Sequence, residues 1–224
     1  MSHKAEIFRA TVTSKQVTIS EYWLRNLLEI AVVFAFLLGA IWTPPGEINS
    51  ALVWLGVGSV LVFAVRGRWT ASQMGLTSPV PGAAVIFITG LFFCGIIALA
   101  GIPLRVVGPG YQVPWIQGAA YVLWSLAQEF ILQSVFFLRL EVLVGTRRAV
   151  LVSAGLYAAA HLPSPLLTLL SFFGGILFCE LFRRWRNLYL IGLIHGALGL
   201  TIAASLPDKW MHHMRVGIGY LAIR

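Results

Sequence analysis

Hydrophobic residues fill long runs of the chain, and short stretches rich in polar residues, glycine or proline separate these runs. A helix of about 20 apolar residues, rising 1.5 Å per residue, is long enough to cross the hydrocarbon core of a bilayer. The pattern therefore predicts an all-α fold, a polytopic membrane helix bundle of about seven transmembrane helices. The expected spans are residues 22–42, 51–65, 82–100, 115–144, 149–161, 166–182 and 188–206.

The basic residues between the runs predict the orientation of the bundle. With seven spans, the basic clusters all fall on the side of the N-terminus: the arm itself, Arg66 with Arg68, Arg147 with Arg148, and the RRWR turn at 183–186. The opposite loops contain few Lys and Arg residues. Since cytoplasmic loops are enriched in Lys and Arg, we expect the N-terminus in the cytoplasm.

Composition narrows the class of protein further. Only 11 % of the 224 residues are charged, against about a quarter in a soluble globular protein. The net charge of +8 lies in short clusters, which suit anionic lipid headgroups and not nucleic acid. We expect an integral membrane protein, of the bacterial inner membrane, with lipids as partners. Its expected parts are a basic arm at 1–21, the transmembrane bundle at 22–206 and a C-terminal tail at 207–224.

Three ionisable residues lie deep in the expected spans. They are Glu129, His161 and His195, each on a different apolar segment. Counting residues from the span ends places Glu129 and His161 roughly 20 Å in and His195 roughly 13 Å in. Such groups are costly at bilayer depth and usually face a cavity, a partner or a reaction. We expect the three to converge on one buried site, with Glu129 as the base that activates water.

The neighbours of these residues leave alternatives open. Gln133 shares a helix face with Glu129, whereas Gln128 points about 100° away, and interhelical hydrogen bonding alone could explain all three. Tyr157 precedes His161 by four residues in YAAAH. Glycines flank His195 in IGLIHGALG; they could serve close helix packing or make room for a substrate backbone.

These segments resemble the CPBP family, the CAAX-protease and bacteriocin-processing intramembrane proteases, over roughly residues 115–205. The family pattern is Glu-Glu-xxx-Arg, then Phe-xxx-His, then His-xxx-Asn or Asp. QEFILQ, YAAAH and HGALG stand at these motifs. The resemblance implies a glutamic-type protease in which Glu129 and His161 share the attacking water and His195 steadies the oxyanion.

The same alignment shows where this chain departs from the family pattern. Gln128 stands at the first Glu, Gln133 at the Arg, and Gly199 at the Asn or Asp that would contact the substrate carbonyl. Either Glu129 has taken over as base, or the protein is a non-proteolytic relative. Arg139 lies ten residues beyond Glu129, and we expect it to extend to the cytoplasmic interface.

The sequence therefore predicts an intramembrane endopeptidase acting on a membrane-anchored or exported protein or peptide, one with a membrane-embedded or lipidated segment. One Glu and two His could also bind zinc, but a Glu-activated water needs no metal or other cofactor. A membrane-embedded binding or scaffold protein is the second hypothesis. A proton-coupled transporter is the third, although no inverted repeat is apparent.

Overall fold

The computed structural model describes residues 3–67 and 69–222, with side chains from Glu21 onward, and all regular secondary structure in these residues is helical, with no strands. This confirms the predicted all-α fold. The helices are α1 His3–Trp42, α2 Glu47–Arg66, α3 Ala83–Leu104, α4 Trp115–Glu129, the π-helix η1 Phe130–Phe137, α5 Leu138–Val144, α6 Thr146–Ala159, α7 Pro165–Trp185, α8 Leu188–Ser205, α9 Asp208–Met211, the short 3₁₀ turn η2 His212–Met214 and α10 Gly217–Leu221.

Six helices of the described chain are long and apolar enough to cross a membrane, if the continuous run from α4 through η1 to α5 counts as one of 30 residues. The helix α6, at 14 residues, is a shorter seventh. About seven spans is thus roughly consistent with the structure. Helices suit this setting because a helix satisfies its backbone hydrogen bonds within itself, where lipid offers no partners.

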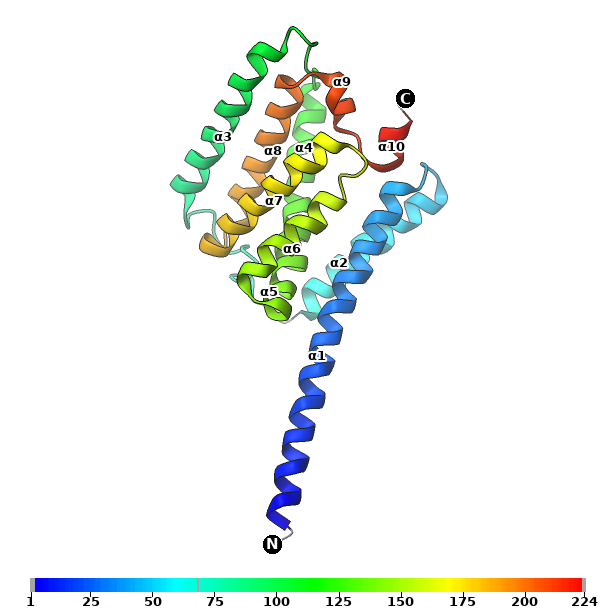
Figure 1. Cartoon of the computed structure of the whole chain (residues 1–224), viewed down its shortest axis with the longest axis vertical. Coiled ribbons are helices and arrows are strands. Elements are labelled where there is room, and N and C mark those ends of the chain that lie inside the picture. Colours follow the sequence, from blue (N-terminus) through cyan, green and yellow to red (C-terminus); the bar gives the residue numbers. More distant parts are fainter. Residues whose placement is uncertain (1–2, 68, 223–224) are drawn as a thin grey trace.

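The long helices run up and down the bundle, and each is joined to the next at alternating ends (Figure 1). The most extensive packing is between α6 and α7, between α4 and α8, and between α3 and α8. The helix α8 therefore lies between α3 and α4 at the centre of the second half of the chain. Its first turn is fixed by Asn187, whose side chain accepts a hydrogen bond from the Leu190 amide and donates to the carbonyls of Pro79 and Pro81.

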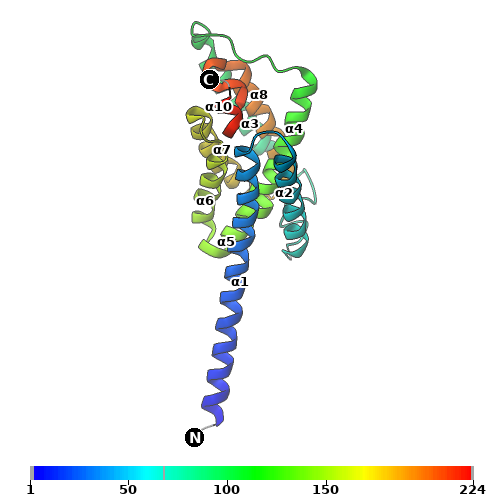
Figure 2. The same cartoon turned by 90° about the vertical axis from the view of Figure 1, so that its right-hand side faces the viewer.

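The two termini lie at opposite ends of the molecule, as an odd number of crossings requires (Figure 1). The ends of α2 and α7 and the start of α6, where the arginines lie, are toward the N-terminal end of the molecule. Arg68, one of these predicted arginines, lies outside the described residues. The arm and the first expected span form a single helix, α1, which projects from the bundle (Figure 2).

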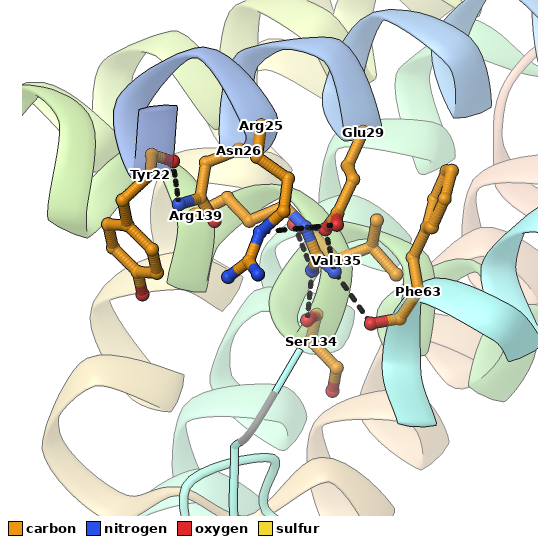
Figure 3. A network of polar contacts seen from close by, with 8 residues as sticks. All are labelled: Tyr22, Arg25, Asn26, Glu29, Phe63, Ser134, Val135 and Arg139. Carbon is orange, nitrogen blue, oxygen red and sulfur yellow. Dashed lines mark hydrogen bonds and ion pairs between the residues drawn. The ribbon is translucent and has the colours of Figure 1, made fainter. Parts of the chain in front are cut away.

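A buried arginine attaches α1 and α2 to the second half of the chain (Figure 3). Arg139 in α5 is fully buried. It donates to the Glu29 carboxylate at 2.7 Å and to the Phe63 carbonyl at 2.8 Å. Its third branch donates to the carbonyls of Ser134 and Val135 at 3.2 and 3.0 Å. One side chain thereby links α1, α2 and η1.

The expectation that Arg139 extends to the cytoplasmic interface is therefore wrong. A π-helix accommodates more residues per turn than an α-helix, so η1 changes the direction in which the residues after it point. Glu29 then supplies a buried counter-ion, and the ring of Trp69 lies 4.6 Å from the guanidinium carbon. The ion pair predicted by the Arg25–Glu29 spacing is present at 3.8 Å, but Arg139 is the closer partner of Glu29.

The tail after α8 folds back over the ends of its neighbours. The Asp208 amide donates to the Pro109 carbonyl, and the Gly217 amide donates to the Leu162 carbonyl. Met211 is fully buried among these elements. The tail thus closes the bundle at the end opposite to the arginine-containing turns (Figure 1).

Candidate active site

Glu129 is the last residue of α4, at the point where the α-helix passes into η1. Its side chain is fully buried, and both carboxylate oxygens have partners. Oε1 lies 2.9 Å from Nδ1 of His195, and Oε2 accepts a hydrogen bond of 2.9 Å from Nε2 of Gln133. Desolvation of an ionisable group is offset only by such partners, so α8 and η1 together hold this carboxylate in place.

His195 is engaged at both ring nitrogens. Nδ1 faces Glu129, and Nε2 lies 2.8 Å from the hydroxyl of Tyr157 in α6. A neutral imidazole with its proton on Nδ1 satisfies both contacts, because it donates to the carboxylate and accepts from the hydroxyl. The ring of Phe178 stacks on the imidazole, with centroids 4.9 Å apart. The imidazole is therefore fixed in both position and orientation.

His161 lies in the turn that follows α6. Its Nδ1 lies 2.7 Å from the backbone carbonyl of Tyr157, so Nδ1 is the donor. In a neutral ring this leaves Nε2 with a lone pair. The two rings meet edge to face, with centroids 4.6 Å apart. Tyr157 thus lies between the two histidines, and its ring connects them.

The glycines of α8 allow close approach to α4. A Cβ at Gly192 would overlap Leu126, and one at Gly196 would lie 3.1 Å from the Cα of Val122. A Cβ at Gly199 would overlap the hydroxyl of Tyr121. Of the two roles left open, the described contacts correspond to close helix packing. This packing brings Glu129 within reach of His195.

The structure thus brings together five of the seven candidate residues: Glu129, Gln133, Tyr157, His161 and His195. Gln128 is only partly buried, and the described contacts place it outside this network. Gly199 packs on α4 beside Tyr121. Within the described residues no group of three His, Cys, Asp or Glu side chains is arranged to hold a metal ion.

Three residues near this network have no place in the sequence prediction. Phe178 gave no signal, because one phenylalanine among many on an apolar helix is ordinary. Tyr121 and Ser125 did give one, since they precede Glu129 and Gln133 at a spacing of four residues. That spacing places Tyr121, Ser125 and Glu129 on one face of α4. Tyrosine and serine are common enough in membrane helices that the pattern did not stand out.

Comparison with known proteins adds one match. Residues 110–201, about two fifths of the chain, match the family model described as type II CAAX prenyl endopeptidase Rce1-like, and members of this family are generally proteases. No match was found among curated proteins or among solved structures. The matched segment runs from the loop before α4 into α8 and contains every residue of the network. The resemblance predicted from the three motifs is confirmed: residues 110–201 of this membrane protein match the Rce1-like CAAX prenyl endopeptidases.

Proposed function

We propose that this protein is an intramembrane endopeptidase whose reaction depends on Glu129 together with His161 and His195. The observation that carries the proposal is the fully buried Glu129 carboxylate, bonded to an imidazole within the segment that matches a protease family. A carboxylate at this depth costs free energy, and for this reason such residues in membrane helices usually have a function. A carboxylate–imidazole pair is a common arrangement for moving protons in hydrolysis.

In the proposed reaction Glu129 takes a proton from a water molecule as its oxygen attacks the carbonyl carbon of the scissile peptide. His161, through the lone pair on Nε2, helps to hold that water. The proton then passes to the amide nitrogen, the C–N bond breaks, and a carboxylate and an amine are released. His195 keeps the carboxylate in position throughout, because Nδ1 donates to Oε1 while Tyr157 fixes Nε2.

The proposed substrate is a protein or peptide with a membrane-embedded or lipidated segment. The buried site lies among membrane-spanning helices, so a substrate must itself partition into the bilayer to reach it. The matching family is described as acting on prenylated CAAX proteins. A prenylated C-terminal peptide is therefore the first substrate class to test, and an unlipidated membrane-spanning peptide is the second.

The test is cleavage in proteoliposomes that contain the purified full chain and one of these two peptides. We expect Glu129→Gln to lower the cleavage rate at least 1,000-fold, because the amide cannot accept the proton of water. Gln128→Ala is the matched control: it changes the adjacent, half-buried side chain, and we expect it to keep the wild-type rate within about threefold. Full cleavage by Glu129→Gln would refute the proposed role of this carboxylate.

A non-proteolytic relative of the family is the second candidate, and a specific observation favours it. Gln128 and Gly199 stand where the family motif has Glu and Asn or Asp. If neither peptide is cleaved by the wild-type protein while both bind to it, this candidate replaces the first.

A further inference from the structure

The inference begins with the donors that the proposed reaction needs. When water adds to a peptide carbonyl, negative charge develops on the carbonyl oxygen, and a donor aimed at that oxygen lowers the barrier. His195 is the donor that the sequence predicts. In the structure both of its ring nitrogens already have partners, Glu129 and Tyr157. The donor therefore has to come from another group.

Tyr121 lies on the face of α4 that carries Glu129, two helical turns earlier, with Ser125 between them. Ser125 is fully buried, and its hydroxyl donates to the backbone carbonyl of Tyr121 at 2.9 Å. This contact fixes the stretch of the face that lies between Tyr121 and the Glu129 carboxylate.

The hydroxyl of Tyr121 points across to α8 at Gly199, where it occupies the place that a Cβ would take. Gly199 follows His195 by one turn of α8. This separation of four residues corresponds to about 6 Å along the helix. In hydrolysis the carbonyl group of the substrate lies about 3 Å from the attacking water and about 3 Å from the oxyanion donor. The water and the donor can therefore be about 6 Å apart. The absent side chain at 199 is thus the reason that a hydroxyl from α4 can reach this position.

We propose that the Tyr121 hydroxyl donates a hydrogen bond to the carbonyl oxygen of the scissile peptide and stabilises the oxyanion that forms there. This role rests on the proposed function and adds a catalytic residue to it. The proton stays on the phenol throughout: the oxygen of water adds to the carbonyl carbon, the C–O bond becomes single, and the charge on its oxygen is bound by the Tyr121 O–H group until the C–N bond breaks.

The kinetic test compares Tyr121→Phe with the wild-type protein in the proteoliposome assay. Removing one oxyanion donor costs about 100- to 1,000-fold in kcat, and we expect a loss of about that size with KM changed less than threefold. Tyr111→Phe is the matched control, since this tyrosine lies in the loop before α4 and its hydroxyl, the only atom that the change removes, donates to Gln117 and to no residue of the site among the described contacts. A Tyr121→Phe variant with wild-type kcat would overturn the proposal.

A second variant pair protects this test against misfolding. Tyr121→Ala removes the ring, and Tyr121→Ala with Gly199→Asn places an amide donor at the position that the hydroxyl occupied. We expect the double variant to recover at least tenfold of the kcat lost by Tyr121→Ala. A double variant that is folded by thermal unfolding, yet no more active than Tyr121→Ala, would count against an oxyanion donor at this position.

A binding measurement needs no turnover and so separates this inference from the proposed function. A phosphinate analogue of the substrate peptide carries a tetrahedral, anionic centre, and the parent amide does not. We expect Tyr121→Phe to weaken binding of the phosphinate at least tenfold and binding of the amide less than twofold. Equal weakening of both, or no preference of the wild-type protein for the phosphinate, would refute the role of Tyr121 even if cleavage is observed.

Discussion

A line of hydrogen bonds passes through the buried site: the Tyr157 hydroxyl, the imidazole of His195, the Glu129 carboxylate and the Gln133 amide. Each donor in this line meets one acceptor when His195 carries its proton on Nδ1. Paired members of such a network rigidify a site and an unpaired member is costly; here the Oε1 atom of Gln133 is the member that has no partner among the described contacts. The contribution of each residue is therefore best measured by removing one polar atom at a time.

Tyr157→Phe removes one hydroxyl and leaves the ring in place. Nε2 of His195 then loses its donor in a buried setting, which costs about 1–3 kcal/mol. We expect the free energy of unfolding in detergent to fall by that amount and the cleavage rate to fall at least tenfold, because the imidazole can now rotate. Tyr189→Phe is the control: its hydroxyl donates to the Leu76 carbonyl, but the side chain is exposed. Equal stability of the two variants would contradict the network.

At the scale of the helices, the sequence predicts much of the arrangement. Runs of apolar residues, ended by proline, glycine or arginine, mark the membrane spans to within a few residues, because lipid imposes the length of each. The choice of Glu129 over Gln128 also agrees with the observed burial. The π-helix η1 could not be predicted, since Phe130–Phe137 has no polar period that would reveal a wider turn.

The wrong prediction for Arg139 has the same cause, which is the change of helix type at η1. Helical periodicity relates residues correctly only while the helix keeps 3.6 residues per turn. Arg139 lies beyond η1, and its predicted direction was wrong. Tyr121 lies before it, and its spacing from Glu129 was informative. Contacts between helices, such as Tyr157 with His195, depend on the packing angle of two elements, which no single segment encodes.

The close packing of α8 against α4 gives a prediction about glycine. A Cβ at Gly192 would overlap the side chain of Leu126 and lie 3.0 Å from its Cα, so the two helices must separate. We expect Gly192→Ala to lower the free energy of unfolding by about 1–3 kcal/mol and to slow cleavage by moving His195 away from Glu129. Gly155→Ala is the matched control, since a Cβ there would meet nothing within 4 Å. At a helix position with room for the Cβ, this change stabilises by up to about 1 kcal/mol.

The measurement is thermal and denaturant unfolding of both variants in the same detergent, followed by the cleavage assay. If Gly192→Ala is as stable and as active as Gly155→Ala, the helix contact does not position the site.

At the scale of the whole molecule, the chain divides into the segment that matches the family, 110–201, and the helices before it. The helices α1 and α2 pack mainly on each other, and Figures 1 and 2 show α2 returning alongside α1. Their polar connection to the second half is the Arg139 network (Figure 3). This connection lies one short helix away from Glu129, so it also determines where η1 can lie.

Arg139 and Glu29 provide a double-mutant cycle. Removing one partner of a buried ion pair leaves an uncompensated charge and costs about 3–5 kcal/mol, whereas replacing both with apolar residues is often nearly neutral. We expect Arg139→Met and Glu29→Leu each to destabilise by about that amount, and the double variant by much less. Additive losses in unfolding experiments would show that the two side chains act independently. Arg25→Gln is a control, because the Arg25 pair with Glu29 is longer and half exposed.

The π-helix also has a consequence for how the length of this segment can vary. A π-turn holds one more residue than an α-turn, so deleting a single residue between 130 and 137 would allow an ordinary α-helix to form. Because the wider turn already absorbs the extra residue, this α-helix would still direct Arg139 toward Glu29 and α5 toward α6. A single insertion, or a deletion of two residues, would instead rotate everything after it by about 100° relative to Glu129. One-residue deletions in this segment should therefore be tolerated better than one-residue insertions.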